Sequence, residues 1–273
     1  MIQRLYIPHF PLSQFVEYFF FYEGISFEHK VDRFLPNGDT EIIIDFNDAP
    51  QNIYDNDTLI EIQACHNLWA SGMRTEPITI PAGSQARMMV IMCKKGMAYP
   101  FFPFPMDEIV DSVLDADLIW GTSFAYLREN LLTALPDVDE VFRLTEEFMV
   151  RNFLASPVVN PCVEYAIGEI VRRPDQISLA NLSGKIGYSQ KHFISMFKRQ
   201  IGVTPKSFLK ILRFQKAIND IERAANIDWT TLSQDCGFYD QAHFINDFKV
   251  FSGFTPEQYL KQKSDMLNYV PIA

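Results

Sequence analysis

The feature that most constrains this chain is an internal repeat in its last third. The segment SLANLSGKIGYSQKHFISMFKRQIGVTP (178–205) has the same plan as the segment that ends in TTLSQDCGFYDQAHFINDFKVFSGFTP (230–256). The first matches lie 50 positions apart, and a one-residue insertion makes the later offset 51. The matching pairs are Leu182 with Leu232, Ser183 with Ser233, Gly187 with Gly237, His192 with His243, Phe193 with Phe244, Ile194 with Ile245, Phe197 with Phe248, Lys198 with Lys249, Gly202 with Gly253, Thr204 with Thr255 and Pro205 with Pro256. Two copies of one plan predict two copies of one small folding unit.

Each copy has the layout of a helix-turn-helix. A short helix with apolar periodicity is followed by a glycine that can take the left-handed turn, a capping residue and a second helix. Ser189 and Asp240 are the expected N-caps, because their side-chain oxygens can accept from backbone N–H groups of the next turn. On the second helix of the first copy, Phe193, Met196 and Phe197 fall on one apolar stripe at 3.6 residues per turn.

The opposite faces of the two second helices carry small, amide and basic side chains. These are Lys191, Ser195 and Lys198 in the first copy and Gln241, Ala242, Asn246 and Lys249 in the second. Side chains of this kind are accepted by the major groove of DNA. A helical protein-interaction domain with the same shape is the alternative.

The two halves of the chain differ in net charge. Residues 1–161 hold 10 Lys+Arg against 23 Asp+Glu, or −13, whereas residues 162–273 hold 14 against 11, or +3, which agrees with the total of −10. Between Asp175 and Asp220 the sequence has no acid but eight basic residues. A patch of one sign attracts polyanions such as nucleic acid, although a solvated basic face is the plainer interpretation.

A chain of 273 residues is long enough to form two domains. Residues 1–105 are predicted to be β-rich, with apolar or β-branched segments at 41–46, 58–63, 78–80 and 86–93 between turn clusters. Helical spacing follows in 106–120, 123–135 and 137–154, so that 1–154 forms one domain. Residues 155–161 are the predicted linker, and 162–273 are predicted to be entirely helical. The fold class is therefore α+β, with a small barrel or sandwich in front.

Residues 162–262, including GFYDQAHFINDFKVFSGFTPEQY (237–259), resemble the DNA-binding domain of AraC-type transcriptional regulators. The resemblance implies two helix-turn-helix units joined by a long helix, here about Pro205 to Ile221. The helices at 190–200 and 241–251 would enter successive major grooves, about 34 Å apart.

The resemblance also implies which side chains read bases. Carried over position by position, they are Lys191, Ile194 and Ser195 in the first unit and Gln241, His243 and Asn246 in the second. Members of the family often have an arginine where this chain has Ser195 and Asn246. Since asparagine pairs well with adenine, an A·T-biased site is expected. Asp247 takes the place of Met196, and the sequence offers no reason for this acid.

A second group of residues is expected to contact phosphates. The candidates are Ser189, Lys198, Arg199, Lys206, Lys210 and Lys249. Each neutralised phosphate should contribute about −0.9 to the slope of log affinity against log salt. Arg213 is expected to be structural. His192 and His243 are expected near helix caps or phosphates rather than on a metal.

The front domain resembles the cupin-like sensor domains of such regulators, in LPNGDTEIIIDF (35–46) and KKGMAYPFF (94–102). The resemblance implies a small-molecule effector or a second copy of the chain as a partner. The candidate pocket residues are Arg33, Trp69, Arg87, Tyr99 and Phe102. The isolated histidines include no HxH pair, so that no metal site and no cofactor are expected. The helices of 106–154 could form a dimer seam or simply cover the barrel.

The sequence lacks the motifs of other classes of protein. The sequence lacks GxSxG, GxxxxGK[ST], GxGxxG and HExxH motifs, so an enzyme is not expected. An alkyl-transfer repair protein of the Ada type is the alternative from another class, but it needs clustered thiolates, whereas Cys65 and Cys93 are single. No signal peptide and no apolar run of about 18 residues are found. The expected protein is a cytoplasmic regulator, without membrane contact, whose partners are double-stranded DNA, an effector, a second copy and RNA polymerase.

Overall fold

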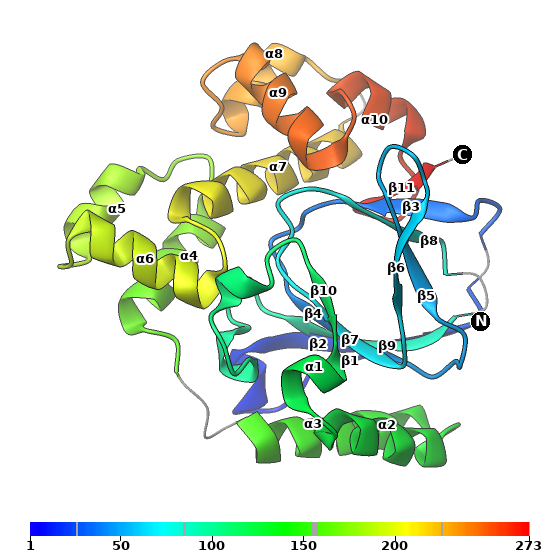
Figure 1. The fold of residues 1–273 in the computed structure, drawn as a ribbon. Coiled ribbons are helices and arrows are strands. Elements are labelled where there is room, and N and C mark those ends of the chain that lie inside the picture. The colour runs from blue at the N-terminus through cyan, green and yellow to red at the C-terminus, as the bar shows by residue number, and fades with distance from the viewer. Residues whose placement is uncertain (26, 84–85, 154–157, 225, 273) are drawn as a thin grey trace.

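The structure is a computed structural model that describes residues 1–25, 27–83, 86–153, 158–224 and 226–272. Two antiparallel sheets form the first half of the chain, and helices form most of the second half (Figure 1). The predicted α+β class is confirmed. The predicted linker lies partly outside the described residues, and the first helix of the second half begins at its last position, Pro161.

The six-stranded sheet has the order β1-β2-β9-β4-β7-β10. Its strands are β1 (Ile2–Tyr6), β2 (Val16–Glu23), β4 (Glu41–Asp45), β7 (Leu68–Ser71), β9 (Arg87–Cys93) and β10 (Val113–Asp115). Side chains alternate between its two faces. Phe19, Phe21, Ile42 and Ile44 lie on the outer face, in one core with the helices α1 (Ala116–Trp120), α2 (Ser123–Ala134) and α3 (Val138–Phe153). These helices therefore cover the sheet.

The five-stranded sheet has the order β11-β3-β8-β5-β6 and faces the inner side of the first sheet. Its strands are β3 (Val31–Phe34), β5 (Gln51–Tyr54), β6 (Glu61–Cys65), β8 (Ile78–Pro81) and β11 (Tyr269–Ile272). The strands predicted at 41–46, 78–80 and 86–93 are confirmed, and the strand predicted at 58–63 begins later, at Glu61. The inner core contains Ile43 and Met88 of one sheet and Ile53 and Ile78 of the other.

The last strand comes from the far end of the chain. β11 pairs with β3 in antiparallel register, with Val270 opposite Arg33, and Val270 is 0% exposed. The prediction that everything after residue 161 is helical is wrong here. Tyr269–Ile272 has an aromatic, a proline and two β-branched residues, which suit an edge strand better than a helix. By pairing with β3, the tail covers a sheet edge that would otherwise be open.

The helix predicted at 106–120 is also wrong over most of its length. The structure places a 3₁₀ turn, η3 (Met106–Glu108), then β10, and only then the short α1. The apolar spacing fits a helix, but β7 offers a free edge with which β10 pairs. Tertiary pairing therefore overrides a local pattern. The helices predicted at 123–135 and 137–154 correspond to α2 and α3 and are confirmed over their described residues.

The C-terminal helices have one core. They are α4 (Pro161–Arg172), α5 (Leu179–Lys185), α6 (Gln190–Ile201), α7 (Pro205–Arg223), α8 (Trp229–Asp235), α9 (Gln241–Ser252) and α10 (Pro256–Gln262). The ring of Phe208 on α7 lies 5.9 Å from that of Phe197, and the ring of Phe214 lies 5.1 Å from that of Phe248. α7 therefore contributes to the cores of both repeats. Among the described helices, none combines the length and the apolar composition that crossing a bilayer requires.

Candidate nucleic-acid interface

The first repeat folds as the sequence predicts. Ser178 caps α5, and Gly187 turns the chain with a φ of +73°. The hydroxyl of Ser189 then accepts a hydrogen bond from the backbone N–H of His192 at 3.3 Å, so that Ser189 is the N-cap of α6. Phe193 and Phe197 are buried on the inner face of α6. The opposite face of α6 is left to solvent.

The second repeat follows the same construction. The carboxylate of Asp240 accepts from the N–H of His243 at 2.7 Å, which confirms it as the N-cap of α9. Gly237 has a φ of +80°, and a Cβ there would lie 2.7 Å from the carbonyl oxygen of Asp175. Glycine is therefore required at this turn for both its conformation and its size. Phe244 and Phe248 are buried on the inner face of α9.

The predicted base-reading residues occupy the uncovered faces of α6 and α9. Lys191, Ser195 and Asn246 are exposed, whereas Gln241, His243 and Ile194 are half-buried. The side-chain oxygen of Gln241 accepts a hydrogen bond from the Thr230 hydroxyl of α8 at 3.3 Å. The faces centred on Ser195 and Asn246 are thus the parts of the two helices that are open to a nucleic acid.

The predicted phosphate contacts divide into two groups. Arg199, Lys206 and Lys249 are exposed and form no ion pair with any residue that the structure describes. Lys198 lies 3.4 Å from Asp107 of η3, and Lys210 lies 2.9 Å from Asp247. Ser189 already serves as a helix cap. Arg213, expected to be structural, donates to the carbonyl of Pro174 at 2.8 Å.

Asp247, which the sequence left unexplained, joins α9 to α7. One carboxylate oxygen lies 2.9 Å from Nζ of Lys210, and the other lies 3.2 Å from Nε2 of His243. In the first repeat, Met196 at the equivalent position packs against the core instead. Asp247 thus replaces an apolar contact by a charged one and holds two side chains that were predicted to contact DNA. Because 37 residues separate Lys210 from Asp247, no local pattern could have predicted the pair.

Replacing Asp247 by asparagine is expected to strengthen binding to DNA of any sequence. The substitution removes a negative charge from α9 and releases Lys210 for a phosphate, which should steepen the salt slope by about 0.9. Affinity measured against salt on a random-sequence duplex checks this. The control is Asp117→Asn at an exposed position of α1, which removes the same charge elsewhere and should leave the slope unchanged. Equal slopes for both variants would contradict the prediction.

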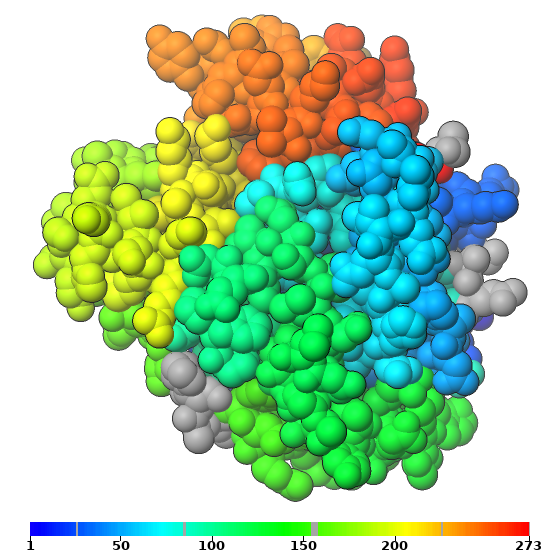
Figure 2. All heavy atoms as spheres, viewed as in Figure 1, coloured from blue at the N-terminus to red at the C-terminus, as the bar shows by residue number. Residues whose placement is uncertain are grey.

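The front domain contacts the C-terminal ends of both α6 and α9. A Cβ at Gly202 would lie 2.8 Å from Val110, and a Cβ at Gly253 would collide with the guanidinium of Arg33. Gly202 and Gly253 are equivalent in the repeat, so the front domain meets each unit at the same place. Figure 2 shows the surface of the segment around η3 directly beside that of the first unit. The outward polar faces of α6 and α9 stay uncovered.

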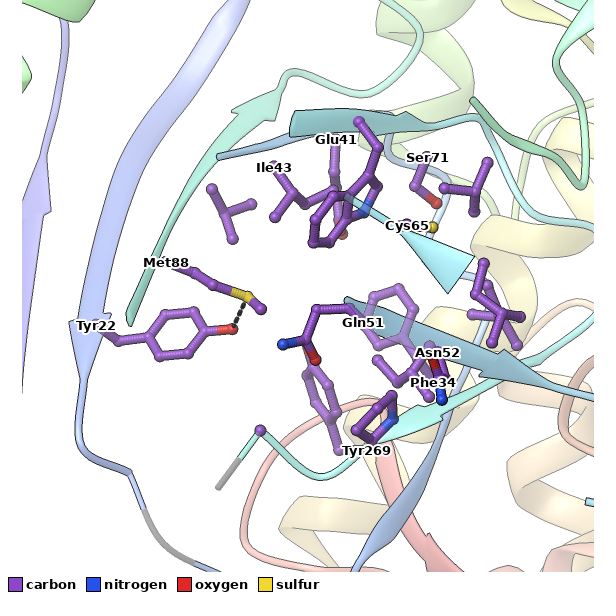
Figure 3. A pocket seen from close by; sticks show the side chains of 18 residues that line it. Tyr22, Phe34, Glu41, Ile43, Gln51, Asn52, Cys65, Ser71, Met88 and Tyr269 are labelled. Carbon is purple, nitrogen blue, oxygen red and sulfur yellow. Dashed lines mark hydrogen bonds between the residues drawn. The ribbon is translucent and has the colours of Figure 1, made fainter. Parts of the chain in front are cut away.

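The predicted pocket residues do not lie together. Trp69 lines a cavity of about 120 Å³ between the two sheets (Figure 3). Arg33 instead stacks over the ring of Phe254 at 5.0 Å, and Arg87 pairs with Glu23 on β2. Tyr99 and Phe102 pack into the core beneath the helices of the front domain.

A second cavity, of about 510 Å³, lies between the front domain and the C-terminal half. Its wall includes Gln215 and Asn219 of α7, and Asn268 and Tyr269 of the tail. The amide of Gln215 donates to the carbonyl of Pro36 at 2.7 Å and to the side chain of Asn268 at 2.8 Å. Sequence reasoning missed these residues, because their position depends on how the tail folds back.

The repeat, its capped helices and its uncovered polar faces define the C-terminal half as a helix-turn-helix domain. Residues 182–262 match the family described as "Helix-turn-helix domain", and residues 4–115 match a domain of unknown function, DUF6597. These matches support the resemblance of the chain to AraC-type transcriptional regulators.

The comparisons with known proteins include two curated regulators and one solved structure. The "Probable thc operon regulatory protein" of Rhodococcus erythropolis is 27% identical over 182 residues, which are 56% of this chain and 54% of that protein. The "Probable transcriptional regulator LumQ" of Photobacterium leiognathi is 33% identical over 85 residues, 31% of this chain and 34% of that one. The solved structure of ToxT from Vibrio cholerae is 12% identical, with 89% of this chain and 98% of that chain covered, at a TM-score of 0.47. This chain thus spans about half the length, or less, of the two curated relatives.

Proposed function

We propose that this chain regulates transcription by binding double-stranded DNA through α6 and α9. The observation that carries the proposal is the repeated pair of capped helices with uncovered polar faces. They are flanked by the exposed cations Arg199, Lys206 and Lys249, which form no ion pair within the described part of the chain. The connecting helix α7 has 19 residues and is about 28 Å long, which suits two units that bind neighbouring turns of the major groove.

We further propose that the front domain controls this binding through a small-molecule effector. The cavity of about 510 Å³ has the size of a ligand site, and both halves of the chain form its wall. A ligand there would contact the tail and α7, so that it could bind one arrangement of the two halves better than another. Such differential binding is what coupling between two sites requires. A second copy of the chain, RNA polymerase and a cytoplasmic location stay predictions from the sequence.

The alkyl-transfer alternative gains no support from the cysteines. Cys65 lies on β6 and Cys93 on β9, in different sheets. Burial raises the pKa of Cys65 to about 12 and also raises the pKa of Cys93. Both groups are therefore thiols at neutral pH, whereas alkyl acceptance needs a thiolate.

The test is a selection of duplexes from a random-sequence pool with the full chain. A two-part site preferred about a thousandfold over random DNA is expected. Asn246→Ala should weaken binding to that site by about tenfold to a hundredfold and relax the base preference beneath α9. The matched control, Asn152→Ala on α3, should bind like the unaltered chain. Equal, weak binding of all duplexes would refute sequence-specific regulation and favour a protein-interaction module.

A further inference from the structure

The cavity between the front domain and the C-terminal half has an aromatic wall. Strand alternation places Tyr18, Phe20 and Tyr22 of β2 on the inner face of the six-stranded sheet, and all three line the cavity. The tail adds Tyr269, whose ring lies 4.9 Å from that of Phe34 on β3. Aromatic rings from three strands therefore surround one space.

Glu41 lies on the same inner face as these tyrosines. In the sheet register, Glu41 of β4 is opposite Met92 of β9, and Met92 is opposite Tyr18 of β2. Residues opposite one another in antiparallel strands point to the same face. Glu41 lines both this cavity and the inner cavity of about 120 Å³, where Figure 3 shows it in the wall together with Tyr22 and Tyr269.

The charges at this wall are unbalanced. Lys95 lies 2.8 Å from Asp39, and His29 lies 2.7 Å from Asp32, which gives both aspartates a partner. Glu41 forms no ion pair with any lysine, arginine or histidine among the described residues. Burial, reinforced by the charge of Asp39, raises the pKa of Glu41 to about 7, although a hydrogen bond from Asn37 and the charges of Lys95 and Arg74 lower it. A positive charge beside Glu41 would favour its ionised form, because opposite charges stabilise each other.

We infer that this cavity binds an organic cation, an amine or a quaternary ammonium compound with an apolar body. Aromatic faces attract cations through their quadrupoles, and rings arranged around a carboxylate are a recognised way to hold an ammonium group. Tyr18, Tyr22 and Tyr269 supply the faces, Glu41 supplies the charge, and Phe20 supplies apolar surface. The inference rests on the proposed function for its biological role, as the identity of the effector, but the site stands on its own geometry.

Calorimetric titration of the full chain without DNA tests the site. Two cationic probes, choline and benzyltrimethylammonium, are compared with 3,3-dimethylbutan-1-ol, the uncharged carbon analogue of choline, and with the anion phenylacetate. Saturable binding of at least one cation is expected, at least about tenfold tighter than either of the other two probes, since aromatic faces and a carboxylate attract a desolvated cation but not an alcohol or an anion. The site is overturned if neither cation binds at millimolar concentration, or if the alcohol or the anion binds as tightly.

Variants separate the carboxylate from the rings. Glu41→Gln should remove the preference for cations, whereas Glu147→Gln on the exposed face of α3 should keep it. Tyr18→Phe retains the ring and should bind, and Tyr18→Leu should bind more weakly. Unchanged cation preference in Glu41→Gln would overturn the assignment. Cation binding by a chain that binds no DNA would refute only the proposed function, and specific DNA binding without cation binding would refute only this inference.

Discussion

Val270→Asp is expected to detach the C-terminal strand from the front domain. Val270 is 0% exposed at the centre of β11, where it faces the core that α7 and α9 share with the front domain. A carboxylate at this position would be desolvated in an apolar core, and Arg33, which lies opposite on β3, already stacks on Phe254 and donates to the carbonyl of Asn56. Burial of a charge in such a core is among the most destabilising changes a single substitution can make. The tail can detach from the sheet and expose the carboxylate to water. The free energy of unfolding should therefore fall by the net free energy that holds the tail on the sheet, about 3 kcal/mol.

Two measurements check this result. Urea unfolding should show the lower stability, and the backbone amides at positions 270 and 272 should exchange with solvent much faster in the variant, since their pairing with β3 is lost. The matched control is Leu267→Asp, which places the same charge in the same tail at a side chain that is 45% exposed. If both variants are equally stable and protected, β11 does not hold the two halves together.

Glu41→Gln is expected to make the protein more stable at pH 8 and to have little effect below pH 4.5. The unfolded carboxyl ionises near its ordinary pKa of 4.5, whereas burial raises the pKa in the folded protein to about 7. As the pH rises through this interval, the unfolded state releases its proton first, so that the unaltered chain loses stability. The loss is complete above about pH 7 and amounts to about 3 kcal/mol. Glutamine does not ionise and avoids the loss.

The measurement is urea unfolding of both proteins from pH 4 to pH 8. The difference in unfolding free energy should grow between pH 4.5 and pH 7 and then level off. Glu147→Gln serves as the control, because Glu147 is exposed and pairs with Arg143 on the surface of α3. A difference that does not change with pH would show that Glu41 is not desolvated in the folded state.

The two helix-turn-helix units could be predicted almost completely from the sequence. Their turns, caps and buried stripes depend on residues three or four positions apart, such as Ser189 with His192 and Asp240 with His243. Interactions between such near neighbours can be predicted from the order of the residues. The duplication made the prediction stronger, because each copy tested the interpretation of the other.

Features that depend on residues far apart in the sequence were predicted wrongly or not at all. The segment 106–120 has helical spacing, yet its middle forms β10 because β7 has an open edge. Arg33 was expected in a pocket, whereas the structure places it against Gly253 and Phe254 of the second unit. Asp247 had no explanation until α7 brought Lys210 beside it.

The sequence by itself determined the class of the helix-turn-helix half, its helices and the faces that they leave open. Only the tertiary structure decided where the cavity lies and which residues close it, because its wall combines Glu41 with Tyr269, from opposite ends of the chain. The physical reason is the range of the interactions. Caps and helical stripes depend on residues that are close together in the sequence. An open sheet edge, in contrast, can pair with a strand from any part of the chain that the fold places beside it.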